Sequence, residues 1–190
     1  MDSAEFQDRR FHFYLVQAVT VARAPLAVAF AGVLLWGGQS TSVLIACAVL
    51  LLAAEMTDAA DGFLARRLGV VSQWGATLDP YVDSVFRMIV YWALGWAGLA
   101  LGLTVLVMAV RDVTVAYCRI LLTRRGRSVA ARWSGKLKAI VQGVAGFVLL
   151  AGPFYWPLTG PWTVPAVSWL VIVTTALSAV EYIAAAVSEG

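Results

Sequence analysis

The sequence predicts an all-α integral membrane protein, a single domain over residues 1–190 with six transmembrane helices and a short N-terminal interfacial helix. Three observations support this fold class. The chain is 61% hydrophobic and only 13% charged, with a mean hydropathy of +0.81, which is typical of multi-span membrane proteins. At ~20 residues per span, six helices use about 120 residues and leave short loops. Glycines and prolines separate the apolar segments.

Each predicted helix follows from an apolar stretch between two such breaks. The first ten residues, MDSAEFQDRR, are polar and lack the apolar core of a signal peptide, so we expect an uncleaved interfacial helix that leads into the first span. The breaks lie at Gly37-Gly38, Gly69, Gly98 to Gly102, Gly126, and the proline-rich stretch 153–165. The spans are therefore predicted over 13–36, 41–68, 75–98, 103–123, 133–156 and 163–187.

The basic residues predict the orientation of these spans. The connections near 37–40, 99–102 and 157–162 contain no Lys or Arg. The opposite helix ends carry Arg9, Arg10, Arg66, Arg67, Arg124, Arg125, Arg127, Arg132, Lys136 and Lys138. Because basic loops stay in the cytosol, both termini are expected on the cytosolic side of the cytoplasmic (inner) membrane. The net charge of +3 then reflects this asymmetry and contact with anionic lipids, and no nucleic-acid partner is expected.

Acidic residues interrupt the second and third spans at their cytosolic ends. Asp58 and Asp61 are three residues apart, and Asp79 and Asp83 are four apart, so each pair lies on one face of its helix; Glu55 lies one turn upstream. A carboxylate inside a bilayer costs roughly 2.5–3.5 kcal/mol on insertion scales, so the group calls for a compensating cation. Four such oxygen ligands suit Mg²⁺ or Mn²⁺.

These residues form the pattern D-x2-D-G-x2-A-R-x8-G-x3-D-x3-D, which resembles the signature of the CDP-alcohol phosphotransferases. All eight specified positions match: Asp58, Asp61, Gly62, Ala65, Arg66, Gly75, Asp79 and Asp83. The resemblance implies a homodimeric membrane enzyme in which an alcohol attacks a CDP-linked lipid and CMP leaves. It also implies a two-metal site, in which two ions about 3.5–4 Å apart could clamp the oxygens of the reacting phosphoryl group. Asp83 would bind the second metal ion and accept the proton of the alcohol. The CDP-lipid would lie against Asp58, Gly62, Ala65, Arg66 and Gly75, because glycines allow close approach and arginine binds phosphate.

A basic group downstream is the candidate site for the acceptor alcohol. Arg111 and Arg119 are eight residues apart, near one face of the fourth predicted span, and an intramembrane arginine is a functional candidate. With Lys136 and Lys138 they could hold a phosphate, whereas the alternative for Arg111 is a salt bridge with Asp112 or the acidic group.

This stretch is similar to the corresponding stretch of bacterial phosphatidylglycerophosphate synthases. The pattern Gln17-x-x-Thr20-x-x-Arg23 also resembles the first span of that group, except that Gln17 stands where the group usually has asparagine. Ser84 stands where that group usually has lysine, with Arg87 one turn later.

The leading functional hypothesis is therefore transfer of the phosphatidyl group from CDP-diacylglycerol to sn-glycerol 3-phosphate. One alternative is the same chemistry with another acceptor, such as inositol phosphate, serine or a phospholipid; four basic residues favour a phosphorylated one. A cation transporter with carboxylates at its ion site is a second alternative, but it needs neither the glycines nor Arg66. An inactive structural relative is a third, disfavoured because all four aspartates are present.

Overall fold

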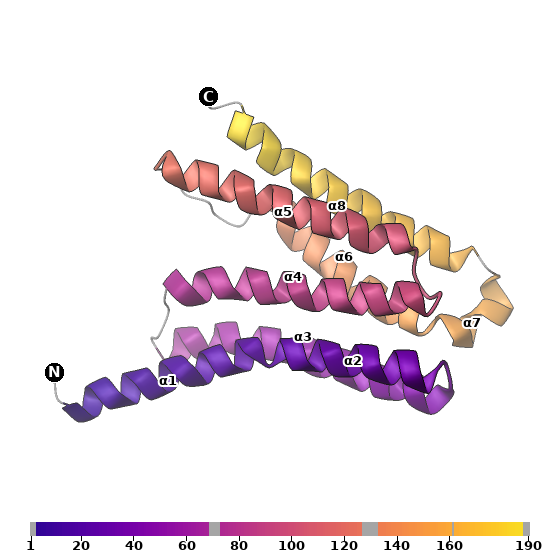
Figure 1. The fold of residues 1–190 in the computed structure, drawn as a ribbon, viewed down its shortest axis with the longest axis horizontal. Helices are drawn as coiled ribbons and strands as arrows, with labels where there is room; N and C mark the ends of the chain where they lie inside the picture. Colours follow the sequence, from indigo (N-terminus) through magenta and orange to yellow (C-terminus); the bar gives the residue numbers. More distant parts are fainter. Residues whose placement is uncertain (1–2, 69–72, 127–132, 161, 188–190) are drawn as a thin grey trace. The chain divides into compact units, whose positions relative to one another are not determined.

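A computed structural model describes residues 3–68, 73–126, 133–160 and 162–187, and their side chains except those of 3–11, 59, 61, 63–66, 73, 74, 76 and 77. Within these ranges every regular element is a helix, which confirms the all-α class (Figure 1). The helices are α1 (Ser3–Val21), α2 (Arg23–Gly37), α3 (Thr41–Arg67), α4 (Gln73–Trp96), α5 (Gly102–Arg124), α6 (Trp133–Leu150), α7 (Gly152–Thr159) and α8 (Thr163–Val187).

Four of the six predicted spans match single helices to within two residues at each end: α3, α4, α5 and α8. Their ends were predictable because glycine is placed where the chain turns. Gly38, after α2, has a φ of 72°, and Gly98, after α4, has a φ of 74°. This left-handed conformation costs glycine little and other residues more, so it ends a helix cleanly.

The other two predicted spans are each divided into two helices. The first is divided at Ala22 into α1 and α2, near Pro25, which cannot donate a hydrogen bond to the carbonyl four residues earlier. The polar N-terminal residues form the beginning of α1 rather than a separate helix. The fifth was predicted as one helix over 133–156, which is wrong: α6 and α7 are bent by 76° after Leu150. Pro153 explains the bend, because its ring removes a donor and crowds the preceding turn.

Three helical stretches in the described part of the chain are long and apolar enough to cross a membrane: His12–Gly37, Thr41–Asp58 and Thr163–Val187. The bent pair of α6 and α7 becomes a fourth if it counts as one span. The chain is thus a membrane protein by the length and composition of its helices. Charged residues inside α4 and α5 lower the hydropathy of these two helices, and those charges belong to the candidate sites.

The chain divides into two compact units, Met1–Val90 and Tyr91–Gly190. In the first unit α2 and α3 run side by side, and α1 also packs on α3 (Figure 1). Ala27, Phe30 and Leu34 are buried on α2, at helical spacings of three and four. Residues 44, 47, 51 and 54 repeat this spacing on α3. Each helix therefore presents one continuous stripe to its neighbour, which places the C-terminal end of α3 beside the start of α2.

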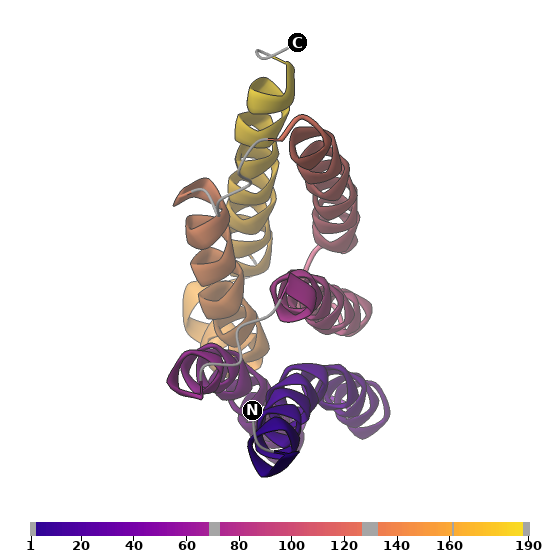
Figure 2. The same cartoon turned by 90° about the vertical axis from the view of Figure 1, so that its left-hand side faces the viewer.

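In the second unit α8 packs against both α5 and α6 (Figure 2). The contact stripe on α8 contains small polar residues, Ser168, Thr175 and Ser178, all buried. Gln142 of α6 donates from Nε2 to the Thr175 hydroxyl over 2.9 Å. Outward residues such as Leu177 are apolar and exposed. Polar groups inside and apolar groups outside are typical of helix packing in lipid, where small residues allow close approach. This stripe positions the candidate acceptor site.

Candidate active site

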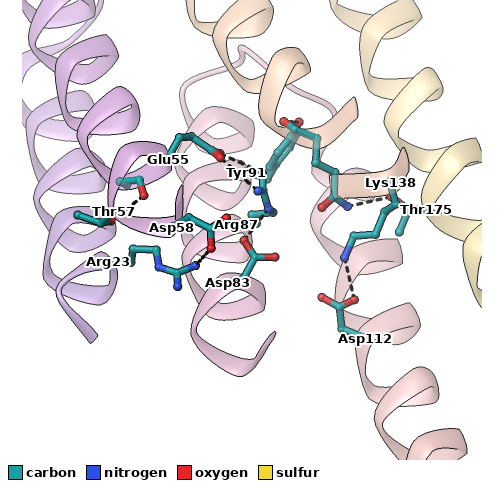
Figure 3. Close-up of polar contacts among 12 residues, drawn as sticks. Arg23, Glu55, Thr57, Asp58, Asp83, Arg87, Tyr91, Asp112, Lys138 and Thr175 are labelled. Carbon is teal, nitrogen blue, oxygen red and sulfur yellow. Dashed lines mark hydrogen bonds and ion pairs between the residues drawn. The ribbon is translucent and has the colours of Figure 1, made fainter. Parts of the chain in front are cut away.

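The acidic group of the first unit comes from two helices. Glu55 and Asp58 lie one turn apart on α3, and Asp79 and Asp83 lie one turn apart on α4. The spacing of four residues keeps Asp79 and Asp83 on one face of α4, as the sequence predicted, and the spacing of three keeps Glu55 and Asp58 on one face of α3. The side chain of Asp61, the predicted partner of Asp58, lies outside the described side chains. Figure 3 shows Glu55, Asp58 and Asp83 among the side chains of two arginines.

Side chains from the N-terminal helices hold two of these carboxylates. Arg23, at the start of α2, is only 1% exposed, and its guanidinium forms an ion pair with Asp58, whose side chain is 46% exposed. The buried Thr20 hydroxyl of α1 donates to Asp79 Oδ1 over 3.2 Å. A buried cation needs a counter-charge, so the ion pair with Arg23 keeps the Asp58 side chain in place. Thr20 and Arg23 thus orient two aspartates of the acidic motif, Asp79 and Asp58.

Asp83 is held by its own helix. Arg87, four residues later and 6% exposed, donates from Nε to Asp83 Oδ1 over 2.9 Å. The two terminal nitrogens of Arg87 reach across to α3, Nη1 to Glu55 Oε1 at 3.1 Å and Nη2 to Glu55 Oε2 at 3.4 Å. Asp83 makes no other hydrogen bond or ion pair to a described residue. Neither Glu55 nor Arg87 was among the predicted site residues, although the Asp83–Arg87 spacing in an apolar helix was a visible signal.

Part of the predicted site lies outside the described side chains: those of Asp61, Ala65 and Arg66. Gly62 is half-buried on α3, and Gly75 is buried on α4. Among the described side chains, no three His, Cys, Asp or Glu residues gather closely enough to hold a metal ion. Because one of the four predicted ligands is not described, the metal site remains a prediction.

The basic group of the second unit centres on Asp112. Arg111, nearly buried on α5, donates from Nη1 to Asp112 Oδ1 over 2.8 Å and from Nε to the Ser178 hydroxyl over 2.8 Å. Lys138 of α6 donates to the same Asp112 oxygen over 3.1 Å (Figure 3). Arg111 therefore forms the salt bridge that was its alternative interpretation. Lys138 is 5% exposed, so it is not a solvated charge.

Tyr182 of α8 joins the two arginines of this group. The guanidinium carbon of Arg111 lies 5.7 Å from the centre of the Tyr182 ring, and that of Arg119 lies 5.4 Å from it. Arg119 also donates from Nη2 to the Tyr182 hydroxyl over 3.3 Å. A side chain on Gly135 would approach both, since its Cβ would lie 3.4 Å from that hydroxyl and 3.9 Å from Arg111 Nη2. Glycine at this position leaves room beside the two guanidinium groups.

Three of the four predicted acceptor residues are thus connected: Arg111 to Lys138 through Asp112, and Arg111 to Arg119 through Tyr182. Lys136 is exposed, and no contact with a described residue ties it to the others. The reason is helical geometry, because residues two apart on α6 point to different faces. Sequence reasoning missed Tyr182, although the polar residues Thr175, Ser178 and Tyr182 recur at spacings of three and four on an apolar helix.

A helical membrane protein with an acidic group on two adjacent helices and a basic group on three others is consistent with an enzyme that acts on phosphorylated lipids. Comparison with known families gives the class. The family model described as CDP-alcohol phosphatidyltransferase matches residues 13–183. The chain belongs to this family and is a phosphatidyltransferase, which confirms the predicted enzyme class and removes the transporter alternative.

Bacterial proteins of known name are similar over most of the chain. A probable phosphatidylglycerophosphate synthase of Mycobacterium tuberculosis is 34% identical over 180 residues, which cover 92% of this chain and 82% of that protein. A CDP-diacylglycerol–glycerol-3-phosphate 3-phosphatidyltransferase of Bacillus subtilis is 31% identical, covering 90% and 93%. The protein of that name from Escherichia coli is 32% identical over 149 residues, covering 74% and 78%. The predicted similarity to phosphatidylglycerophosphate synthases is confirmed.

Proposed function

We propose that this enzyme transfers the phosphatidyl group of CDP-diacylglycerol to sn-glycerol 3-phosphate, giving phosphatidylglycerophosphate and CMP. The observation that supports a phosphorylated acceptor is the bonding of the Arg119 side chain. Its Nε is buried without a hydrogen-bond partner among the described residues, and it forms no ion pair with any of them. A buried donor without a partner costs about 1–3 kcal/mol, so an anionic ligand is the natural occupant. The names of the relatives from three bacteria support the same acceptor.

A phosphate suits this basic group better than a neutral alcohol. Arg111 and Lys138 share one carboxylate, Asp112, so the connected group carries more positive than negative charge. Arginine forks match phosphate oxygens in pairs, which adds orientation to attraction. The hydrogen bonds that Arg111 donates to Ser178 and Arg119 donates to Tyr182 keep the forks in place before the ligand arrives. An acceptor without a phosphate would offer no negative charge to Arg119, which forms no ion pair with a described residue.

Asp83 is the proposed general base. One of its oxygens is held by Arg87, and the second makes no hydrogen bond within the described chain. That second oxygen accepts the proton of the primary hydroxyl of glycerol 3-phosphate. The hydroxyl oxygen then forms a bond to the β-phosphorus of CDP-diacylglycerol, and the bond from that phosphorus to the bridging oxygen breaks. CMP leaves with the electron pair. Positioned proton transfer of this kind contributes typically 10²- to 10⁴-fold.

The donor set fits divalent cations. Asp58, Asp79 and Asp83 supply carboxylate oxygens, the ligands that Mg²⁺ and Mn²⁺ prefer, and Asp61 is proposed as the fourth. Each of the first three already has an oxygen oriented by Arg23, Thr20 or Arg87. Such supporting contacts orient metal ligands in many sites. Two ions, when bound, would neutralise charge that develops on the pyrophosphate.

We further propose how the enzyme sits in the membrane and where the nucleotide lies. Six spans, formed by α1–α2, α3, α4, α5, α6–α7 and α8, would place both termini and the acidic motif on the cytosolic side of the inner membrane, as the distribution of Lys and Arg indicates. The CDP-lipid is proposed to lie along Asp58, Gly62, Ala65, Arg66 and Gly75. A homodimer is the expected assembly from the family resemblance.

The test of this function is incubation of purified protein with CDP-diacylglycerol and a panel of alcohols, with CMP release and product mass as readouts. Glycerol 3-phosphate should give the largest kcat/KM, and its product should have the mass of phosphatidylglycerophosphate. Faster CMP release with serine, inositol phosphate or a phospholipid would replace the proposed acceptor by that alcohol. No CMP release with any of them would contradict the proposed reaction.

Replacement of Asp58 or Asp61 by alanine should weaken metal binding about tenfold as well as slow the reaction. Three carboxylates cannot hold two ions with the geometry that four provide. Titration of Mn²⁺ binding to each purified variant measures the effect independently of turnover. Thr114→Val, which removes a hydroxyl bonded to its own helix on α5, is the control. An unchanged midpoint and stoichiometry in both aspartate variants would rule out a shared metal site.

A further inference from the structure

Arg87 contacts two carboxylates in different ways. Both terminal nitrogens face the two oxygens of Glu55, at 3.1 and 3.4 Å, while only Nε contacts Asp83, at 2.9 Å (Figure 3). The guanidinium is almost completely buried, and the side chains of Glu55 and Asp83 are 26% and 25% exposed. The two terminal nitrogens of Arg87 therefore bond Glu55, which lies outside the acidic motif. Asp83, which belongs to the motif, receives one hydrogen bond.

The arrangement matters because an arginine fork usually closes on both oxygens of one carboxylate. If Arg87 faced Asp83 alone, the fork would bond both oxygens, and the proton of the acceptor would have to approach an oxygen already bonded to Arg87. Glu55 prevents this by binding the terminal nitrogens. It also supplies a second negative charge for the buried guanidinium, so Asp83 is not the sole counter-ion of Arg87. One oxygen of Asp83 is fixed, and the other makes no bond to a described residue.

We propose that Glu55 and Arg87 are a positioning pair: Glu55 holds the fork of Arg87 so that Arg87 fixes Asp83 by one oxygen and leaves the other for the proton of the acceptor. This inference rests on the proposed role of Asp83 as general base. Arg87 and Glu55 touch no substrate in this scheme and act only through Asp83.

The test compares Glu55→Gln, Arg87→Met and the double variant in steady-state CMP release. Glu55→Gln keeps the shape of the side chain but frees one arm of Arg87 to close on Asp83. Arg87→Met removes the contact that orients Asp83. Each single variant should lower kcat about tenfold and leave the KM of both substrates within about twofold. In the double variant kcat should be almost the same as in Arg87→Met alone, because Glu55 acts through Arg87.

Thr57→Val is the matched control and should keep the wild-type kcat. The Thr57 hydroxyl bonds the carbonyl of Ala54 on its own helix and no other described residue. Thermal melting of each variant gives the folded fraction, so that kcat is expressed per folded molecule. Glu55→Gln carries the test even if Arg87→Met reduces the yield of folded protein. The inference would be overturned if Glu55→Gln kept the wild-type kcat per folded molecule. It would also be overturned if Glu55→Gln lowered kcat by the same factor in the Arg87→Met background as in the wild type.

The same experiment separates this inference from the proposed function. A wild-type enzyme that prefers another alcohol would change the acceptor, yet the pattern of kcat losses can be measured with that alcohol and should be the same. A wild-type enzyme that is active while its Glu55 and Arg87 variants keep full kcat would remove only the positioning pair. A wild type that releases no CMP with any alcohol would remove both.

Discussion

Replacement of Asp83 by asparagine is expected to lower kcat for CMP release at least a hundredfold while CDP-diacylglycerol still binds. The amide has the shape of the carboxylate but cannot take a proton from the acceptor hydroxyl, and general-base catalysis contributes typically 10²- to 10⁴-fold. The amide oxygen can still accept the hydrogen bond from Arg87 Nε, so the α4 side of the acidic group should keep its arrangement. Binding is measured as the rise in melting temperature on addition of CDP-diacylglycerol.

The control for this variant is Ser84→Ala, which removes a hydroxyl from the next residue of the same helix and should leave kcat within about twofold. The comparison separates loss of the base from general disturbance of α4. Turnover of Asp83→Asn above about a tenth of the wild-type value would rule out Asp83 as the base. A loss of CDP-diacylglycerol binding as large as the loss of kcat would show that Asp83 serves in binding.

The spacing of the acidic motif made much of the first site predictable. Helical geometry fixes that Asp79 and Asp83 share a face of α4, whatever else that helix contacts. The bounds of α3, α4, α5 and α8 were predictable for a related local reason, since glycines mark their ends. Local rules failed at the fifth predicted span, where Pro153 bends an apolar stretch that hydropathy alone treats as one helix.

Contacts between helices were not predictable in the same way. The spacing of four residues between Asp83 and Arg87 indicates a contact, but nothing in the sequence shows that Glu55 faces Arg87 from another helix. Tyr182 lies 63 residues from Arg119, and only the packing of α8 on α5 brings them together. A periodic pattern gives the buried face of each helix, whereas the choice of neighbouring face depends on how side chains of several helices fit together.

The second large effect is expected at the acceptor site, where Arg119→Ala should raise the KM for glycerol 3-phosphate about ten- to a hundredfold. The variant removes a charge-assisted contact to the phosphate, worth roughly 1.5–3 kcal/mol. The KM for CDP-diacylglycerol should change little, because Arg119 is proposed to contact the acceptor and not CDP-diacylglycerol. Arg119 forms no ion pair with a described residue, so its removal leaves no described carboxylate without its counter-ion. Steady-state kinetics with each substrate varied in turn measures both constants.

Arg125→Ala is the matched control, because Arg125 is an exposed arginine at the C-terminal end of the helix that carries Arg119, and its guanidinium donates to the carbonyl of Ala186. It should leave both KM values unchanged, which separates specific phosphate binding from a general loss of positive charge. Lys138→Met should raise the acceptor KM less than Arg119→Ala, since Lys138 already compensates Asp112. An unchanged acceptor KM in Arg119→Ala would show that the phosphate binds elsewhere. The enzyme class would stand on the family match, but the unpaired Nε of Arg119 would then need another anion.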